Sequence, residues 1–312
     1  MKKTIAIYGT GSSADDLLEE ITENEKLICF YETHPNKKIY KDLPVYSIDE
    51  IDESIDETFI ASVFYPEIIE LLVKKNISVE KFTVASAHAD DPRYGPIRIP
   101  AKDVSNELDK YIEFRKTINK IEKIVDAQTS LEFNNRLDHL TFAYSHAPVN
   151  TTLVEFGVYR GESLLHLANI SNLPVWGFDS FSGFAEGSPF IYPENINRVE
   201  VDLPNYLKEY EYLVEGYFED SLVPWIKENN IQKIGFVHYD AGHYEAAKYV
   251  LEKIESHLIV GSILVFDEFI PTQSELHASE FQALNETYNG KYKILSKCDS
   301  GSSTSVTIRY VG

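Results

Sequence analysis

Two glycine-rich turns constrain the fold of this chain more than any other feature, because each lies between a predicted strand and a predicted helix. The first turn is "YGTGSSA" at 8–14, which follows the apolar stretch "TIAI". The second is "EFGVYRG" at 155–161, which follows "TLV". A strand, a glycine turn and a helix in this order begin a parallel α/β unit whose backbone N–H groups can face a nucleotide. The sequence therefore predicts an α/β fold with two such units.

The chain has 312 residues, which suits two domains better than one compact core. The stretch "DDPRYGPIRIPAKD" at 90–103 contains three prolines and a glycine and predicts an irregular connector. We therefore expect a small Rossmann-like domain at 1–95, and a helical linker plus a larger α/β domain at 96–312. Within the first domain, "SIDEIDESI" at 47–55 predicts a short amphipathic helix.

The linker is expected to be helical over about 104–145, with Phe114, Ile118, Ile121 and Val125 on one apolar stripe. The stripe favours packing on the chain's own core, with a dimer contact as the alternative. The second domain ends in two predicted strands, "KYKILS" and "SVTIRYV", joined by a short turn. Such a connection predicts an antiparallel hairpin at the C-terminal end of an otherwise parallel sheet.

Composition limits the partners and the compartment. The net charge is −21, and such a surface repels phosphate backbones, so we expect no nucleic-acid partner. No apolar run approaches the roughly 20 residues of a membrane span, and the run after "MKK" ends at Gly9, too early for a signal peptide. Cys29 and Cys298 have no metal-ligand spacing and fit a reducing compartment. We therefore expect a cytoplasmic protein that acts on a small molecule.

The first glycine turn has the nucleotide-binding pattern G-x-G-x-x-A, with Gly9, Gly11 and Ser12, and Glu32 ends the next strand where an acid for ribose belongs. The unit is only about half of a full dinucleotide fold, so an NAD site would be incomplete. With "LPVYSIDEI" downstream, it resembles the N-terminal Rossmann-like domains of sugar acyltransferases and sugar-modifying methyltransferases, which implies a nucleotide or nucleotide-sugar ligand. A retained fold with an empty site stays open.

The second glycine turn lacks the tight G-x-G, because Gly157 and Gly161 are four residues apart. Glu155 directly precedes it, and a carboxylate there suits a positively charged ligand end and would repel a pyrophosphate. Asp179 ends the next predicted strand, where a carboxylate can accept both ribose hydroxyls. These charges favour S-adenosylmethionine (AdoMet), a sulfonium cation, over a dinucleotide.

Five blocks carry a family resemblance: "VEFGVYRGESLLHLA", "VWGFDSFSGFAEG", "GYFEDSL", "VHYDAGHYEAAKYVLEKI" and "GSILVFDEF". In this order, over residues 130–312, the chain resembles the macrocin O-methyltransferase (TylF) family. The resemblance implies the class I AdoMet-dependent methyltransferase fold, and methyl transfer to a sugar hydroxyl in glycan or glycoside biosynthesis. It also implies assistance by a divalent metal, usually Mg²⁺, and, together with the apolar stripe, a homo-oligomer.

The resemblance implies roles for individual residues around AdoMet. The turn residues would line its methionine part, with Ser163 at the carboxylate, and Asp179 would hold the ribose. Asp220 would lie at the adenine end, with an N-cap of the following helix as the alternative. The implied cofactor-binding residues are Glu155, Gly157, Tyr159, Gly161, Ser163, Asp179, Ser180, Phe181 and Asp220.

Acidic residues follow the fourth and fifth predicted strands, Asp240 in "HYDAGHYE", and Asp267 and Glu268 in "FDEF". The carboxyl ends of neighbouring parallel strands meet at one edge of a sheet, so these side chains can converge. Hard divalent cations prefer carboxylate oxygens, and we therefore expect these three residues to form a divalent-metal site, which the family resemblance implies is for Mg²⁺. The alternative is a plain acidic rim on an acidic protein.

The family pattern D-G-D-x-Y reads "DAGHY" here, so Gly242 replaces the expected catalytic base. A sugar hydroxyl needs a proton acceptor, and the candidates are His243 and Asp240. His238 lies inside a predicted strand and is interpreted as a core residue. Two alternatives to a methyltransferase stay open. One is an NAD-dependent nucleotide-sugar oxidoreductase or epimerase that uses the first turn, although a Tyr-x-x-x-Lys pair after that turn is lacking. The other, which the departure at Gly242 keeps open, is a non-catalytic nucleotide-binding protein.

Overall fold

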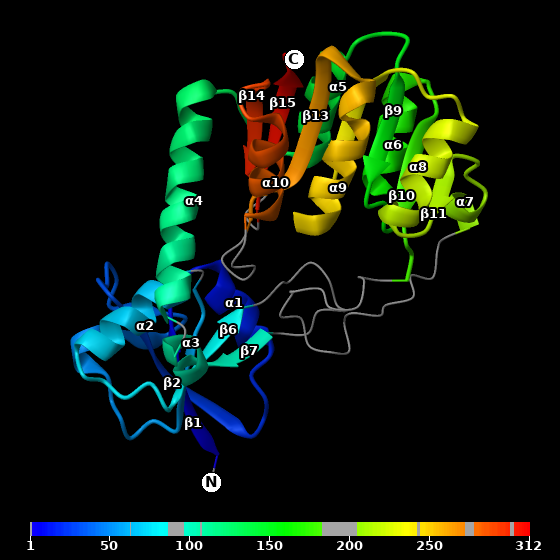
Figure 1. Cartoon of the computed structure of the whole chain (residues 1–312). Helices are drawn as coiled ribbons and strands as arrows, with labels where there is room; N and C mark the ends of the chain where they lie inside the picture. Colours follow the sequence, from blue (N-terminus) through cyan, green and yellow to red (C-terminus); the bar gives the residue numbers. More distant parts are fainter. Residues whose placement is uncertain are drawn as a thin grey trace. The chain divides into compact units, whose positions relative to one another are not determined.

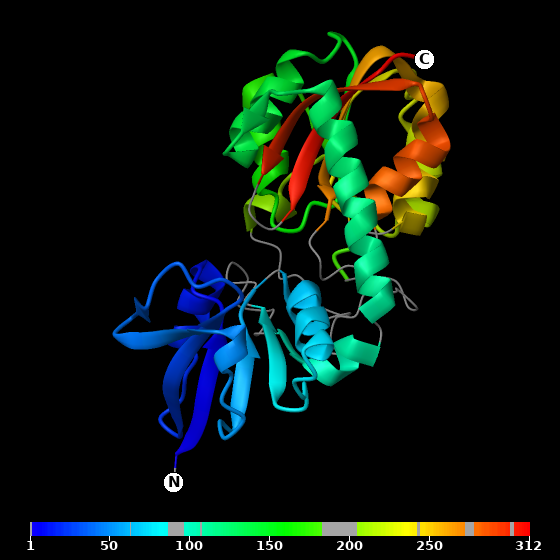
Figure 2. The same cartoon turned by 90° about the vertical axis from the view of Figure 1, so that its left-hand side faces the viewer.

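The chain folds into two compact units, Met1–Arg115 and Lys116–Gly312, each built on its own sheet (Figures 1 and 2). The computed structural model describes residues 2–62, 64–86, 97–106, 108–182, 205–241, 244–271, 278–299 and 303–312. Within these residues, none of the helices combines the length and the apolar character that crossing a membrane requires.

The first unit contains a seven-stranded sheet in the order β3-β4-β2-β1-β5-β6-β7. Strands β4, β2, β1, β5 and β6 run parallel, and β3 and β7 are antiparallel edges. The elements are β1 (Lys3–Tyr8), α1 (Ser12–Glu19), β2 (Glu25–Glu32), β3 (Ile39–Tyr40), β4 (Leu43–Ser47), η1 (Ile48–Glu50), β5 (Glu57–Ile60), α2 (Tyr65–Lys74), β6 (Phe82–Ser86), β7 (Ile97–Pro100) and α3 (Ala101–Asn106).

Two local predictions for this unit are wrong. The helix expected at 47–55 is only the short 3₁₀ turn η1, because the Asp52 side chain accepts the N–H of Ser54 at 2.8 Å and so favours a turn. The connector expected at 90–103 is regular from residue 97 onward, where β7 pairs with β6. Proline is tolerated there because β7 is an edge strand. Residues 87–96 lie outside the described part of the chain.

The second unit contains an eight-stranded sheet in the order β11-β10-β9-β12-β13-β15-β14-β8. Strands β11, β10, β9, β12 and β13 run parallel, and β15 is antiparallel to both β13 and β14. The elements are β8 (Glu132–Phe133), α5 (Arg136–Ser145), β9 (Thr152–Phe156), α6 (Glu162–Ser171), β10 (Val175–Asp179), α7 (Asn205–Lys208), β11 (Leu213–Glu215), α8 (Phe218–Glu228), β12 (Ile234–Tyr239), α9 (Tyr244–Ile254), η2 (Glu255–His257), β13 (Leu258–Ile270), α10 (Ser279–Tyr288), β14 (Tyr292–Asp299) and β15 (Thr304–Tyr310).

This strand order confirms the predicted fold class, a parallel Rossmann-like sheet that ends in an antiparallel hairpin. Helices α5 and α6 pack together on one face, and α8, α9 and α10 follow one another on the other (Figure 1). The core beneath α5 and α6 is mainly aliphatic and includes Leu140, Leu164 and Ile263, with Phe236 among the aromatic members. The buried sheet fixes the strand ends, and with them the acidic residues of the site described below.

The helix expected over 104–145 is three helices, because α4 (Leu108–Gln128) follows α3 and α5 begins only at Arg136. At the end of α4 the Thr129 hydroxyl accepts the N–H of Leu131 at 3.0 Å and donates to the carbonyl of Leu295 at 2.8 Å. The predicted stripe on α4 is buried within the single chain, at Phe114, Ile118, Ile121 and Val125. The two units divide inside α4, whereas the sequence placed the domain boundary near residue 95.

Candidate active site

The second glycine turn packs against the end of β12. Gly157 has a φ of +90°, and a Cβ atom on it would lie 1.9 Å from the carbonyl oxygen of Asp240. The N–H of Asp240 in turn donates to the carbonyl of Phe156 at 2.8 Å. Gly161, at φ +77°, is the N-cap of α6. Only glycine fits at position 157 without displacing the backbone. Because Gly157 has no side chain, the backbone of Asp240 can lie directly beside the turn.

Asp179, at the end of β10, holds this turn in place. Its Oδ2 accepts the N–H groups of Val158 and Tyr159 at 2.9 and 2.8 Å, and its Oδ1 accepts that of Phe181 at 2.8 Å. Tyr159 and Phe181 have φ angles of +52° and +51°, which are strained for side chains of this size. A carboxylate accepts about four hydrogen bonds, so Asp179 keeps capacity for a further donor, and its contact with ribose stays a prediction. Ser180 lies between Asp179 and Phe181 in the chain.

Glu155 lies beneath the turn and has no exposed surface. One carboxylate oxygen accepts the hydroxyl of Ser163 at 3.0 Å, and the other contacts Nδ1 of His238 at 2.9 Å. The sequence suggested that Glu155 faces a cationic ligand end and that Ser163 bonds the ligand carboxylate. In this structure both side chains have protein partners, and their direct contact with a ligand stays a prediction.

His238, which the sequence suggested to be a core residue, is fully buried, but it is not an inert one. Its Nδ1 bonds Glu155, and its Nε2 lies 3.7 Å from Oδ1 of Asp267. Burial lowers the pKa of His238, but the Asp267 and Glu155 carboxylates outweigh burial and raise this pKa to about 9. At neutral pH the ring is therefore a buried cation between two anions.

Arg136 links the two aspartates at the strand ends. It is the first residue of α5, whose N-cap Asn135 accepts the N–H of Asp138 at 3.0 Å. The Arg136 Nε donates to Oδ1 of Asp267 at 3.0 Å, and its Nη2 donates to Oδ2 of Asp240. The sequence gave no signal for this residue, because its partners lie 131 and 104 positions away.

The two aspartates differ in acidity. Burial and the neighbouring Asp267 carboxylate raise the pKa of Asp240 to about 6, although Arg136 opposes this. Burial also raises the pKa of Asp267, but its contacts with His238 and Arg136 outweigh burial and leave it below its ordinary value. Asp267 is therefore the firmly charged member of the pair, and Asp240 is the one that can exchange a proton near neutral pH.

The predicted metal ligands do not form a metal site as they are arranged here. Asp240 and Asp267 come together, but the Arg136 guanidinium lies between them. The third predicted ligand, Glu268, donates its backbone N–H to Glu280 at 2.9 Å. Across the described residues, no three His, Cys, Asp or Glu side chains are grouped so that they could hold a metal ion. The present geometry therefore does not fit a divalent ion.

Two further predicted positions have different outcomes. Asp220 is not the N-cap of α8, because the helix begins at Phe218 and Tyr217 is its N-cap. Asp220 lies exposed in the first turn, and its role at an adenine ring stays a prediction. Gly242 and His243, the second candidate base, lie outside the described residues.

In the first unit the predicted nucleotide turn lies beside Glu32. Gly9 has a φ of +123°, and a Cβ atom there would lie 2.6 Å from the carbonyl oxygen of Ala61. Gly11 is the N-cap of α1, with open space beside it. The Thr10 hydroxyl donates to Glu32, so the acid predicted for ribose is already bonded to the turn. Only the backbone of Ser12, the first residue of α1, is described.

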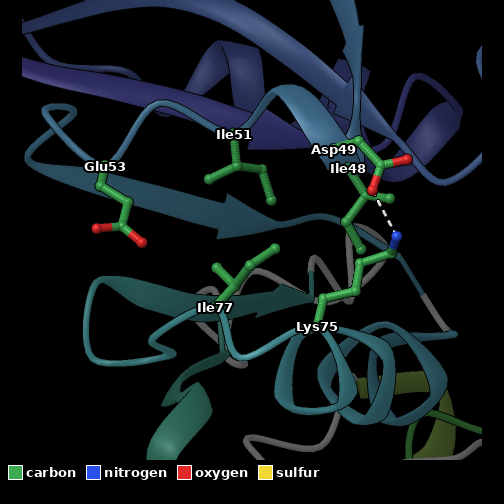
Figure 3. Close-up of a pocket in the computed structure, with 6 residues that line it drawn as sticks. All are labelled: Ile48, Asp49, Ile51, Glu53, Lys75 and Ile77. Atoms are coloured by element: carbon green, nitrogen blue, oxygen red, sulfur yellow. Dashed lines mark hydrogen bonds and ion pairs between the residues drawn. The ribbon is translucent and has the colours of Figure 1, made fainter.

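A shallow cavity of about 370 Å³ in the first unit lies apart from these residues (Figure 3). Its lining comes from η1, the segment that follows it and the end of α2, and an ion pair joins Asp49 and Lys75 across it. The lining residues are Ile48, Asp49, Ile51, Glu53, Lys75 and Ile77. Because neither Gly9, Gly11 nor Glu32 lines it, this cavity is not the predicted nucleotide site.

Among solved structures, the chain is similar to CalS11, a calicheamicin methyltransferase, at 23% identity and a TM-score of 0.47, covering 72% of this chain and 98% of that one. It is also similar to the O-methyltransferase NovP, at 16% identity and a TM-score of 0.42, covering 57% and 80%. An O-methyltransferase from Bacillus cereus in complex with SAH matches at 14% identity and a TM-score of 0.38, covering 67% and 96%. No curated protein matches.

At these scores the likenesses add nothing to what the strand order already shows. The match to a family is more direct, because it covers the strands and turns that build the site. Residues 154–269, which contain the glycine turn, Asp179, Asp240 and Asp267, match the family described as a methyltransferase domain (Methyltransf_24).

Proposed function

We propose that the protein is an AdoMet-dependent O-methyltransferase that acts on a sugar hydroxyl in glycan or glycoside biosynthesis. The observation that carries the proposal is the turn after Gly157, which is strained at Tyr159 and held by Asp179 inside the segment that matches a methyltransferase domain. Strained backbone of this kind is concentrated at ligand sites. The choice of a sugar acceptor rests on the sequence resemblance to the macrocin O-methyltransferase family.

The geometry supports a division of roles within one site. Asp179 would accept a ribose hydroxyl, and the turn from Gly157 to Gly161 would face the methionine part of AdoMet. Asp240 lies beside this turn, at the strand end where an acceptor hydroxyl would meet the methyl group. With Gly242 in place of the family's usual acid, Asp240 is the described residue that can take the hydroxyl proton, and His243 stays the other candidate.

Assistance by Mg²⁺ is implied by the family resemblance alone. The arrangement of Arg136 between Asp240 and Asp267 does not fit it, and no step of the proposed reaction depends on it. The first unit is proposed to bind a nucleotide or nucleotide-sugar through Gly9, Gly11, Ser12 and Glu32, with a retained but empty site as the open alternative. A homo-oligomer and a cytoplasmic location likewise remain expectations from the sequence.

The proposal is tested by incubating the protein with AdoMet labelled in the methyl group and a panel of nucleotide-sugars and glycosides. We expect label in a sugar product, and calorimetric titrations should show heat with AdoMet. Heat with NAD but none with AdoMet would favour the oxidoreductase or epimerase alternative. AdoMet binding without transfer to any sugar would contradict the sugar assignment and favour a non-catalytic binding protein or another acceptor.

A further inference from the structure

We infer that Arg136 is the cation that bridges Asp240 and Asp267, and that its guanidinium fills the place where the sequence alone predicts a magnesium ion. The inference takes its location from the proposed function, but it concerns metal binding and can be tested without any methyl transfer. It rests on the contacts among the side chains of Arg136, Asp240 and Asp267, and on the backbone that positions them.

The guanidinium binds the two carboxylates from one planar group. Nε and Nη2 are directed at different aspartates, Asp267 and Asp240, so the fork of arginine spans both strand ends. The side chains are 30% exposed for Arg136, 31% for Asp240 and 17% for Asp267, so the contacts are only partly open to water. Such partly desolvated, two-point contacts are stronger than exposed ion pairs.

The backbone fixes all three residues before any ligand binds. Arg136 begins α5, and the Asn135 cap sets the start of that helix. Asp240 is fixed by its N–H bond to Phe156 and by the close approach of its carbonyl to Gly157. Asp267 belongs to β13, in the middle of the sheet. The guanidinium contact is therefore built into the fold.

A divalent ion would compete for the same oxygen atoms. Mg²⁺ binds carboxylate oxygens directly, at about 2.0–2.1 Å, and the guanidinium that already contacts these carboxylates would repel it. The two aspartates carry a charge of −2, which Arg136 reduces to −1. Removing the arginine charge restores −2 at one strand edge, the condition that favours a divalent ion.

The inference gives Arg136 a positioning role. It holds the Asp240 carboxylate next to the glycine turn and neutralises part of the acidic edge, so methyl transfer by the intact protein should be unaffected by a chelator. Charge neutralisation by Arg136 explains how acidic residues can lie at both strand ends without a metal ion. Among the described residues, these acids form no cluster of three metal ligands.

The test measures binding of Mn²⁺ alone, by electron paramagnetic resonance of the free ion, to four variants of the full chain. Arg136→Gln removes the charge and keeps hydrogen-bonding capacity. Arg98→Gln is the matched control, because Arg98 also pairs with a carboxylate, Glu20, and is 33% exposed. The other two are Asp267→Asn and the double variant Arg136→Gln/Asp267→Asn.

We expect no saturable Mn²⁺ binding by the wild type or Arg98→Gln. Arg136→Gln should bind one ion, at least about tenfold more tightly than any residual binding by the wild type. The double variant should lose this ion. Either of two results would overturn the inference: a bound ion in the wild type that disappears in Asp267→Asn, or a folded Arg136→Gln protein that binds no more Mn²⁺ than the wild type. The first of these results compares Mn²⁺ binding by the wild type with that by Asp267→Asn. It can therefore overturn the inference even if Arg136→Gln does not fold. Failure of methyl transfer would count against the proposed function and leave these outcomes unchanged.

Discussion

The carbonyl oxygen of Asp240 occupies the space that a side chain on Gly157 would need, with only 1.9 Å between that oxygen and a Cβ atom. The glycine turn and the end of β12 are therefore packed directly against each other. Under the proposed function, a ligand bound at the turn would lie beside Asp240, the proposed proton acceptor.

Gly157→Ala should destabilise the second unit by about 3 kcal/mol or more, because a positive φ and a collision with backbone act together. Gly261→Ala is the matched control. Gly261 has a similar φ of +99°, and its nearest Cβ contact is Pro148 at an ordinary 3.7 Å. The control should cost about 1 kcal/mol, which is the effect of the backbone angle alone. Urea unfolding followed by circular dichroism measures both, and equal losses would contradict the close approach.

Glu155→Gln should destabilise the protein by about 3 kcal/mol, because His238 is then a buried cation without its nearest anion. Glu162→Gln changes an exposed acid seven positions away and should have an effect within about 0.5 kcal/mol. Thermal unfolding of the three proteins at pH 7 provides the comparison. A Glu155→Gln protein as stable as Glu162→Gln would show that the buried pair contributes nothing.

His139 should make stability depend on pH. The ring is fully buried among the hydroxyls of Ser296, Ser305 and Thr307, and burial lowers its pKa from 6.5 to about 4. Between these values the unfolded chain binds a proton that the folded chain does not, so stability is complete above pH 6.5 and falls as pH drops towards 4. The loss from this residue is about 3 kcal/mol.

His139→Gln should remove most of that slope, and His257→Gln, at a partly exposed position in the same unit, should leave it unchanged. The measurement is the free energy of unfolding in urea at several pH values from 7 to 4. Parallel pH curves for wild type and His139→Gln would rule out the neutral buried ring.

Gly11→Asp tests the first unit. The position has a φ of −100° and no atom within 4 Å of a Cβ, so the substitution should leave stability nearly unchanged. The new charge would repel a phosphate at the start of α1, and calorimetry should show at least tenfold weaker binding of UDP-glucose. Wild-type protein that releases no heat with any nucleotide-sugar would favour the retained fold with an empty site.

The sequence was most informative where the signal is local. Strand, turn and helix follow one another within about 20 residues at both glycine turns, and the acids at Asp179 and Asp240 were located by their place at strand ends. The antiparallel hairpin followed from the short turn between β14 and β15. These features depend on neighbours in the chain, and the structure confirms their arrangement.

Long-range partners were beyond this reasoning. Glu155 and His238 are 83 positions apart, and Arg136 is farther still from each aspartate, so no spacing rule connects them. Sequence reasoning also failed to find the end of α4, because the side chain there bonds a residue far away in the chain. The hydroxyl of Thr129 bonds Leu295, 166 positions away, and a helical pattern in the sequence gives no sign of such a contact.

The most direct test of the account is a calorimetric titration of AdoMet into the wild-type protein and Asp179→Ala, with circular dichroism to confirm that both are folded. We predict one AdoMet bound per chain, and at least about tenfold weaker binding by Asp179→Ala, the effect of losing one charge-assisted hydrogen bond and the support of the turn. A folded wild type that binds no AdoMet, or an affinity unchanged by Asp179→Ala, would contradict the assignment of this turn as the AdoMet site.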